Sequence, residues 1–153
     1  MNVRGDVTVR QATASDVGLI APLFDAYRQF YRKPSDLNLA HRFLLERLQN
    51  NQSVLFVAIR QDGSAVGFAQ LFPSFSSASA ALIFILNDLF VVPEARRMGV
   101  ASLLLDTATR FGQIGGAVRL TLSTEVTNVT AQALYEARGW KRQTDFYVYN
   151  LLI

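Results

Sequence analysis

The residues best suited to chemistry lie in one short stretch, where an apolar segment ends in a basic turn and a helical pattern begins. The turn and the start of the helix comprise Arg96, Arg97, Met98, Gly99, Val100, Ala101 and Ser102. The first turn of a helix leaves backbone N–H groups without internal acceptors, and these groups attract anions, phosphates above all. Arg96 and Arg97 add positive charge. The stretch therefore predicts a site for a ligand that carries a diphosphate.

Two other phosphate-binding motifs are absent from this stretch. The chain has neither the G-x-G-x-x-G spacing of a dinucleotide fold nor the G-x-x-x-x-G-K-[ST] of a P-loop. The single Gly99 instead removes a side chain where the backbone must come close to something. The expected ligand is therefore not bound by either of those two phosphate loops.

The sequence Arg96-Arg97-Met98-Gly99-Val100-Ala101 resembles motif A of the GNAT superfamily of N-acetyltransferases, [QR]-x-x-G-x-[GA]. A second stretch, Asn128 to Trp140, resembles the later motif N-x-x-A-x-x-[LF]-Y-E-x-x-G-[FW] of the same superfamily. The two motifs occur in the family's order and cover Leu89 to Trp140. This resemblance implies a single acyltransferase domain that uses acetyl-CoA as the acetyl donor and needs no metal.

The resemblance also implies roles for individual residues around the donor. It places the diphosphate on the backbone N–H groups of Arg97 through Ser102, and it pairs the pantetheine arm with the strand residues Leu89, Phe90 and Val91. Asn128 corresponds to an asparagine that bonds the pantetheine amides, and Tyr135 to a tyrosine that protonates the leaving thiolate. Simpler interpretations remain: Asn128 as a helix N-cap and Tyr135 as a core aromatic.

The sequence leaves three alternatives for the general base. Several family members carry a glutamate on the long central strand, but Ile85 and Asn87 occupy the expected face here, and neither side chain is a base. Asp88 alternates to the opposite face unless a bulge re-aims it. Glu125, at the end of the following strand, is a second candidate. A chain of water molecules with no single base is the third.

The acceptor side is expected to bind an amine. The segment from Asn87 to Val91 resembles the polyamine and histone-type branch of the superfamily, and aromatic faces attract amine cations. The candidate acceptor-binding residues are Tyr27, Phe30, Tyr31, Phe75 and Asn87. The alternative for the three aromatic residues of the first helix is simple packing on the sheet.

Composition limits the remaining function classes. The chain has 153 residues, of which 50% are hydrophobic and 18% are charged, as in a globular domain. The absence of cysteine excludes a cysteine nucleophile and thiolate metal sites. The net charge of +3 comes without a block of like charge, so no nucleic-acid partner is expected. Neither a membrane span nor an apolar signal core is evident, so we expect a cytoplasmic location.

The patterns predict an α/β fold with one domain over residues 1–153, a mixed central sheet and flanking helices, in the order β-α-α-β-β-β-α-β-α-β. Ser15 and Ser35 are the candidate caps of the first two helices. Asp62-Gly63 is a hairpin turn, and Pro73 is expected to end the strand that follows it. The expected strands are 7–10, 54–59, 65–72, 81–92, 118–123 and 146–152, and the later helices are 99–111 and 128–138.

Together these observations predict an enzyme that transfers the acetyl group of acetyl-CoA to a primary amine, most simply a small amine or amino-acid-like metabolite, by direct attack in a ternary complex. A protein lysine or N-terminus is the alternative acceptor. A non-catalytic acyl-CoA-binding module is the alternative from a different class. The apolar, strand-like end of the chain, Phe146 to Ile153, predicts a homodimer formed through an open strand edge.

Overall fold

The computed structural model describes the backbone of residues 2–153 and the side chains of residues 5–153. The chain divides into two compact units, Met1–Leu122 and Ser123–Ile153. The first unit holds the sheet and three of the helices, and the second holds one helix and the C-terminal segment. The prediction of one domain over residues 1–153 stays a prediction.

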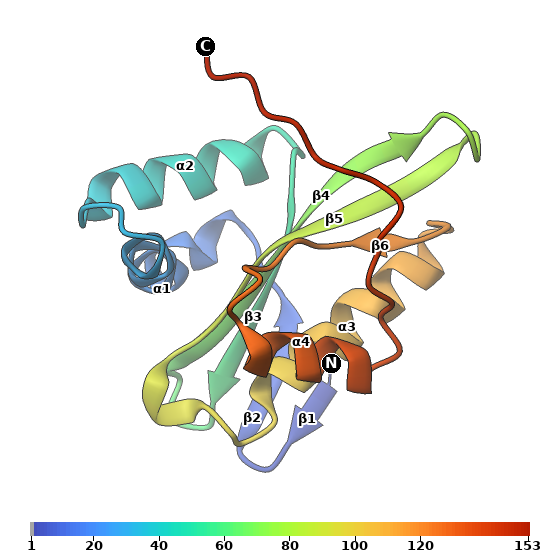
Figure 1. Cartoon of the computed structure of the whole chain (residues 1–153). Helices are drawn as coiled ribbons and strands as arrows, with labels where there is room; N and C mark the ends of the chain where they lie inside the picture. Colours follow the sequence, from blue (N-terminus) through green and yellow to red (C-terminus); the bar gives the residue numbers. More distant parts are fainter. Residues whose placement is uncertain (1) are drawn as a thin grey trace. The chain divides into compact units, whose positions relative to one another are not determined.

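The first unit is built on a six-stranded sheet whose strands lie side by side in chain order (Figure 1). Neighbouring strands are antiparallel except for β5 and β6, which are parallel. The strands are β1 (Asn2–Arg4), β2 (Val7–Gln11), β3 (Val54–Arg60), β4 (Ala65–Ser76), β5 (Ala81–Val91) and β6 (Leu120–Thr121). The predicted α/β class and mixed sheet are confirmed.

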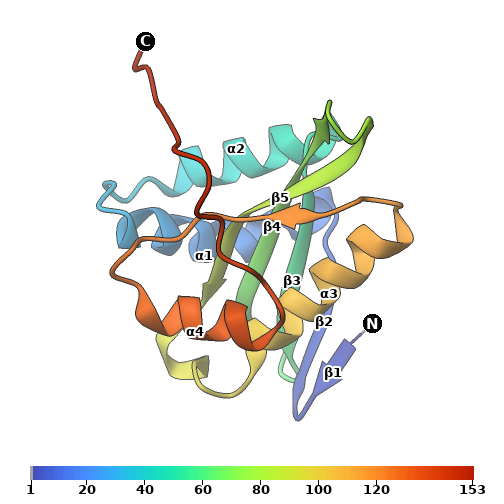
Figure 2. The ribbon, with the colours of Figure 1, turned by 45° about the vertical axis from the view of Figure 1, so that its right-hand side comes forward.

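Helices cover both faces of this sheet. Helices α1 (Val17–Phe30) and α2 (Leu37–Gln49) lie on one face, and α3 (Val100–Ile114) lies on the other (Figure 2). On the first face, Phe24 of α1 contacts Phe68 of β4 edge-on, with ring centroids 6.1 Å apart. On the second face, Phe111 of α3 lies 5.5 Å from the rings of both Phe56 and Phe84. Alternating burial along the strands therefore supplies a core on each side.

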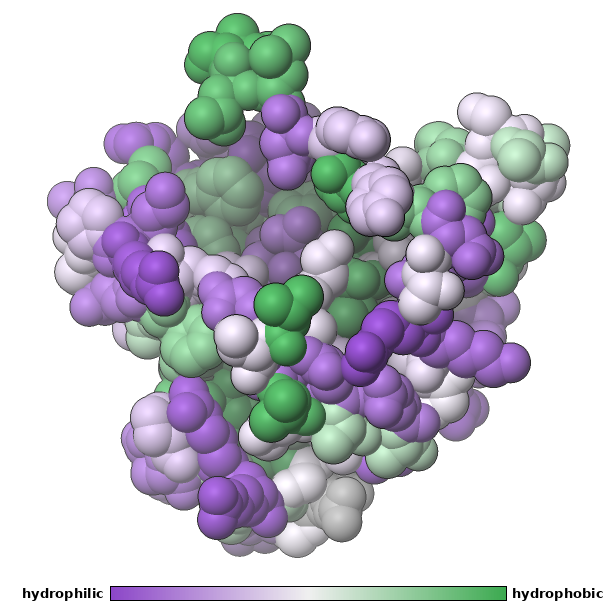
Figure 3. All heavy atoms as spheres, viewed as in Figure 1, coloured by the Kyte–Doolittle hydropathy of each residue, from purple (hydrophilic) through white to green (hydrophobic). Residues whose placement is uncertain are grey.

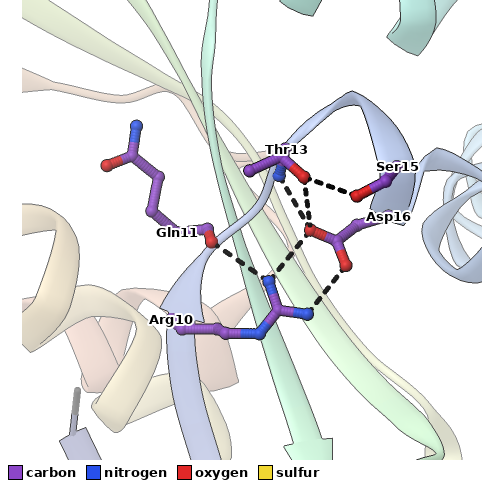
Figure 4. Close-up of polar contacts among 5 residues, drawn as sticks. All are labelled: Arg10, Gln11, Thr13, Ser15 and Asp16. Atoms are coloured by element: carbon purple, nitrogen blue, oxygen red, sulfur yellow. Dashed lines mark hydrogen bonds and ion pairs between the residues drawn. The ribbon is translucent and has the colours of Figure 1, made fainter.

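A polar junction between β2 and α1 fixes where the first helix begins (Figure 4). Arg10 donates two hydrogen bonds to the carboxylate of Asp16, at 2.9 and 2.7 Å, and the backbone N–H of Thr13 donates to the same carboxylate at 2.8 Å. Hydrogen bonding from Arg10 lowers the pKa of Asp16 from its usual 3.8 to about 2. Asp16, rather than the predicted Ser15, is the N-cap residue of α1.

The cap predicted for the second helix is also wrong. Asp36 is the N-cap of α2 and accepts from the backbone N–H of Leu39 at 2.9 Å. The hydroxyl of Ser35 instead donates to Asp25 at 2.7 Å. Serine and aspartate both suit N-cap positions, so their order in sequence does not decide which of two neighbours caps the helix.

Strand β4 runs through Pro73 to Ser76, so the prediction that Pro73 ends the strand is wrong. Strand β3 ends its pairing at Val54 opposite Leu71, and beyond that point β4 has β5 as its partner, with Pro73 opposite Phe84. A proline is tolerated where a strand has an open side, because its missing N–H leaves no neighbour unpaired. Residues 74–76, which lie beyond the predicted end of the strand, therefore belong to β4.

The second unit begins after β6, which is shorter than the predicted strand over 118–123. It contains α4 (Val129–Ala137), which confirms the helix predicted over 128–138. The predicted strand over 146–152 is wrong: within the described residues, this segment makes no ladder pairing. β-Propensity reflects packing of side chains on a strand that is paired and half-buried, and this segment is neither paired nor half-buried.

The side chains of this final segment are exposed. The large apolar residues among them are more than three-quarters exposed, and these are Phe146, Tyr147, Val148, Tyr149, Leu151, Leu152 and Ile153. Apolar atoms gather at the end of the chain that is marked C in Figure 1 (Figure 3). The segment therefore presents an apolar surface.

Candidate active site

A cavity of about 440 Å³ lies between the two helices of one face and strands β4 and β5 in the first unit. The ring of Tyr27 contacts two other aromatic rings of the cavity, with its centroid 6.1 Å from that of Phe24 and 5.0 Å from that of Tyr31. The lining residues are Phe24, Tyr27, Arg28, Tyr31, Lys33, Leu39, Phe43, Phe72, Asn87 and Asp88. The cavity thus combines aromatic walls with a few polar and charged groups, as small-molecule sites commonly do.

A β-bulge brings Asp88 to this cavity. Along the β4–β5 ladder Gln70 faces Asp88, but the next residue of β4, Leu71, faces Leu86. Asn87 is therefore the extra residue of β5, and the regular alternation of side chains is broken there. As a result, Asn87 and Asp88 both line the cavity although they are adjacent in sequence. From the sequence, Asp88 was expected on the opposite face unless a bulge re-aimed it, and the structure has such a bulge.

The carboxyl group of Asp88 is buried and held by amides. Only 3% of the residue is exposed. Gln70 donates from Nε2 to one carboxylate oxygen at 2.5 Å, and Asn87 donates from Nδ2 to the other at 3.0 Å. Burial raises the pKa of Asp88 above its usual range, while the hydrogen bonds from Gln70 and Asn87 act in the opposite direction. A carboxylate with a raised pKa is a stronger base than one in water.

Tyr27 completes this polar end of the cavity. Its hydroxyl donates to the backbone carbonyl of Asn87 at 3.2 Å. Burial and the charge of Asp88 raise the pKa of the Tyr27 phenol. Tyr27 therefore keeps its proton at neutral pH and acts as a hydrogen-bond donor.

The other predicted acceptor-binding residues are divided by the structure. Tyr31 and Asn87 line the cavity together with Tyr27. Phe30 is 56% exposed and Phe75 is 74% exposed, and neither belongs to the lining residues. Phe30 is the last residue of α1, and Phe75 lies on the part of β4 beyond its pairing with β3.

Two charged residues of the cavity, Arg28 and Lys33, were not predicted from the sequence, and neither was Gln70, which donates to Asp88. Arg28 follows Tyr27 directly and shares the helix face of Phe24 and Tyr31, so helical spacing was the available signal. Gln70 is fully buried in the otherwise apolar stretch 65–72 of β4. A polar residue in such a strand needs a buried partner, which is the signal that could have identified it.

The basic turn after β5 leads directly into helix α3. A 3-10 turn, Pro93–Ala95, follows the strand, and Arg97 and Gly99 then adopt positive φ values of 62° and 80°. The first backbone bond to the Gly99 carbonyl comes from Leu103, at 3.0 Å. The N–H groups of residues 100–102 thus lie in the helix turn that has no intrahelical acceptor.

The two arginines of the turn differ. Arg96 donates from Nε to the backbone carbonyl of Val91 at 2.9 Å, and its guanidinium lies 5.8 Å from the centre of the Phe90 ring. It therefore ties the turn to the end of β5. Arg97 is exposed, like Met98 beside it. Arg96 is also exposed and bonds a neutral carbonyl, so both arginines contribute positive charge at the turn.

Strand β5 is paired on only part of one edge. Its parallel pairing with β6 covers Phe84 and Ile85. Within the part of the chain that the structure describes, no strand pairs with this edge from Leu86 to Val91. Leu89, Phe90 and Val91 therefore lie on a strand with an open edge just before the basic turn.

The remaining site candidates lie in the second unit. Asn128 caps α4 by accepting from the N–H of Ala131 at 3.1 Å, as its simpler interpretation requires. The ring of Tyr135 contacts that of Trp140, with centroids 6.2 Å apart. Glu125 is exposed. Of the described residues, no group of His, Cys, Asp and Glu could hold a metal ion, and no helix is long and apolar enough to cross a membrane.

Comparison with known proteins identifies the family. Residues 20–140 match the model of the acetyltransferase (GNAT) family. The chain is 48% identical over 145 residues to the N-acetyltransferase YhfO of Bacillus subtilis, covering 95% of this chain and 97% of that protein. It is 30% identical over 100 residues to an aminoglycoside N(6')-acetyltransferase type 1 of Klebsiella aerogenes, covering 64% and 65% of the two chains.

A crystal structure of a probable acetyltransferase is also similar, with a TM-score of 0.90 and 41% identity over 95% of this chain and 97% of that one. The chain belongs to the GNAT family of acetyltransferases.

Proposed function

We propose that this protein transfers the acetyl group of acetyl-CoA to the primary amine of a small molecule, and that the amine binds in the cavity beside Asp88. The observation that carries the proposal is the bulge of β5, which turns a buried carboxylate toward an aromatic cavity. Acetyl transfer to an amine needs a neutral amine, a proton acceptor and close positioning of the two reactants. The cavity supplies an acceptor and a binding surface.

The donor is proposed to be held by the open end of β5 and the turn that follows. The N–H groups from Arg97 to Ser102, with the exposed charge of Arg97, suit a diphosphate. The open edge at Leu89, Phe90 and Val91 suits the amide-containing arm of CoA, which pairs like an added strand. Asn128 is proposed to contact the same arm. Bound acetyl-CoA supplies the thioester carbonyl that the amine attacks.

In this proposal Asp88 takes the proton of the acceptor ammonium, directly or through water, because its raised pKa makes it a stronger base. Gln70 and Asn87 hold the carboxylate in place, and Tyr27 donates a hydrogen bond nearby. Tyr135 is proposed to return a proton to the departing thiolate. Glu125 is exposed, which makes it the less favoured base. The absence of cysteine fits direct attack of the amine on the donor in a ternary complex.

The size and chemistry of the cavity favour a small acceptor over a protein. The aminoglycoside acetyltransferase among the relatives acts on an amine of a small, polar molecule, and such amines are one acceptor class to test. The exposed apolar segment 146–153 supports a homodimer, in which this segment is covered by a second copy.

The experiment is an acceptor panel in which release of free CoA thiol is followed and acetylated products are identified by mass spectrometry. We expect saturable CoA release with at least one primary amine, with intersecting double-reciprocal plots rather than the parallel lines of a ping-pong enzyme. Acetyl-CoA binding without release for any amine would indicate a binding module. Absence of acetyl-CoA binding would contradict the donor site as well.

A further inference from the structure

We infer that the acceptor carries an acidic group in addition to its amine, and that Arg28 binds this group while the amine lies toward Asp88. The inference rests on the proposed function and specifies its substrate class. The acceptor would be an amino acid or a similar amino-carboxylate rather than a polyamine.

Arg28 is placed to face the acceptor. Helix α1 carries Phe24 and Arg28, and Tyr31 comes directly after its last residue. Their spacings of four and three residues place the three side chains on one face of the helix. All three line the cavity. Tyr27, on the same face, donates to the Asn87 carbonyl beside Asp88. One helix face therefore places both Tyr27 and Arg28 at the same cavity.

The guanidinium has unused donor capacity. Its Nη1 atom is buried and has no hydrogen-bond partner among the described residues 2–153. A buried donor without an acceptor is unfavourable, so most such groups in folded proteins are paired. An incoming carboxylate would satisfy this donor, and Arg is the side chain best shaped to bind a carboxylate with two parallel hydrogen bonds.

The nearby carboxylate of Asp25 does not fill this role. It accepts hydrogen bonds from Ser35 at 2.7 Å, from the backbone N–H of Asp36 at 2.8 Å and from Gln29 at 3.1 Å. The charge of Arg28 contributes to the lowered pKa of Asp25, but the strongest contribution is the Ser35 hydrogen bond. Asp25 thus fastens α1 to the segment before α2 and leaves the buried Nη1 of Arg28 unpaired.

The charges of the cavity favour an acceptor with both signs. Its charged lining groups are Arg28, Lys33 and Asp88. A diamine would bring a second positive charge toward two cations. An amino-carboxylate pairs its amine with Asp88 and its anion with Arg28, so each charge meets its opposite. This charge distribution favours an acceptor that carries an anion in addition to the amine cation that the aromatic residues attract.

The test uses acceptor pairs that differ by one acidic group. Lysine is compared with cadaverine, ornithine with putrescine, and 4-aminobutyrate with propylamine; phosphoethanolamine against ethanolamine shows whether a phosphate serves as well as a carboxylate. For each pair we measure kcat/KM by CoA release at physiological ionic strength. We expect the acidic member to be favoured by about 10-fold or more, the range of a charged hydrogen bond.

Arg28→Gln should reduce this preference to near unity, mainly through KM of the acidic member, with KM for acetyl-CoA unchanged. Arg28→Lys should restore part of it, because it keeps the charge and loses the planar fork. Arg42→Gln, which removes an exposed arginine of α2 outside the cavity lining, is the matched control and should keep the preference. Thermal melts establish that each variant is folded.

Equal use of lysine and cadaverine by the native protein would overturn the inference, and so would an equal loss of both in Arg28→Gln. Either result leaves acetyl transfer to amines standing. Absence of CoA release with every amine would instead contradict the proposed function, so the two failures are distinguishable.

Discussion

At the scale of single residues, Asp88 combines a cost in stability with a gain in reactivity. Its folded pKa lies above its unfolded value, so the charged form is less favourable in the folded protein, and the cost is present above the unfolded pKa. At neutral pH the native fold therefore pays for keeping a base in the cavity, as active sites often do.

Replacing Asp88 with Asn tests whether the buried carboxylate lowers stability and raises reactivity. We expect Asp88→Asn to lower kcat by about 100-fold or more and to abolish the fall in kcat/KM that the native protein shows as pH drops through the Asp88 pKa. The melting temperature at pH 7 should stay the same or rise, because the buried charge is gone. A pH–rate profile beside a thermal melt measures both. Unchanged turnover would show that another group or water takes the proton.

Tyr135 allows a second residue-scale test. Tyr135→Phe removes only the hydroxyl and keeps the ring that contacts Trp140. If Tyr135 is the general acid, acetyl-CoA affinity should persist while kcat falls by about 100- to 10,000-fold. Calorimetry gives the affinity and steady-state assays give kcat. A variant with native kcat for a good acceptor would make Tyr135 a packing residue.

Sequence predicted Asp88 only conditionally, and the reason is physical. Side-chain alternation placed it away from the cavity, and only the ladder register shows that Asn87 is the extra residue. A bulge depends on two strands that pair across the sheet, so its position is not encoded in the local pattern of either strand. Arg28 was missed for a related reason: the unpaired state of its Nη1 exists only in the packed structure.

At the scale of elements, the turn between β5 and α3 owes its form to Gly99. Its φ of 80° is unfavourable for a residue with a Cβ, by about 1–2 kcal/mol. We expect Gly99→Ala to weaken CoA binding by about 10-fold or more, since the turn must shift away from the anion-binding geometry. Gly116→Ala is the matched control: Gly116 has a φ of 77°, and an added Cβ there meets nothing within 4 Å.

The control should lose a similar amount of stability and bind CoA with native affinity. Calorimetry with CoA measures the affinities, and denaturant unfolding measures the stabilities. Equal CoA affinities in the two variants would contradict the proposal that the turn is part of the donor site.

The junction of β2 and α1 predicts an acid-sensitive contribution to stability. The pKa of Asp16 is lowered, so its ion pair with Arg10 stabilises the fold fully above the unfolded pKa of 3.8, and this stabilisation is lost as pH falls toward about 2. Asp16→Asn should therefore cost about 1 kcal/mol at pH 6, a value reduced by the solvent screening of Arg10. The difference from the native protein should shrink toward pH 3.

Denaturant unfolding of the native protein, the two single variants and the Arg10→Gln/Asp16→Asn pair forms a double-mutant cycle. A coupling energy that does not change with pH would contradict the assigned ion pair.

Most elements were predictable because their signals are local. Helical periodicity indicates α1, α2, α3 and α4, and Asp62-Gly63 indicates the β3–β4 hairpin. The errors concern pairing. Pro73 continues a strand because β3 has already ended, and residues 146–152 are not a strand because they lack a partner. Both outcomes depend on a neighbouring strand that the local sequence does not describe.

At the scale of the whole molecule, the exposed segment 146–153 predicts self-association. We expect light scattering at micromolar concentration to give twice the monomer mass of 17.0 kDa. Replacing Val148 and Leu151, which are 84% and 88% exposed, by Glu should shift the protein to monomer without loss of the first unit's fold. Asp145→Glu, a change just before the segment that adds no charge, is the control. A native particle of 17 kDa would remove the dimer proposal.

The chain-order sheet has a consequence for how such a protein can diversify. Strands β2 and β3 are adjacent, with Thr8 opposite Ile59, so the stretch carrying α1 and α2 leaves the sheet and returns to the neighbouring position. That stretch supplies most of the acceptor cavity, whereas the glycine turn belongs to β5 and α3. If the cavity binds the amine and the turn binds the donor, as proposed, substitutions or length changes in the two helices would give a new acceptor preference while the turn stays intact. Under that proposal, the part of the gene that selects the amine is separate from the part that recognises the donor.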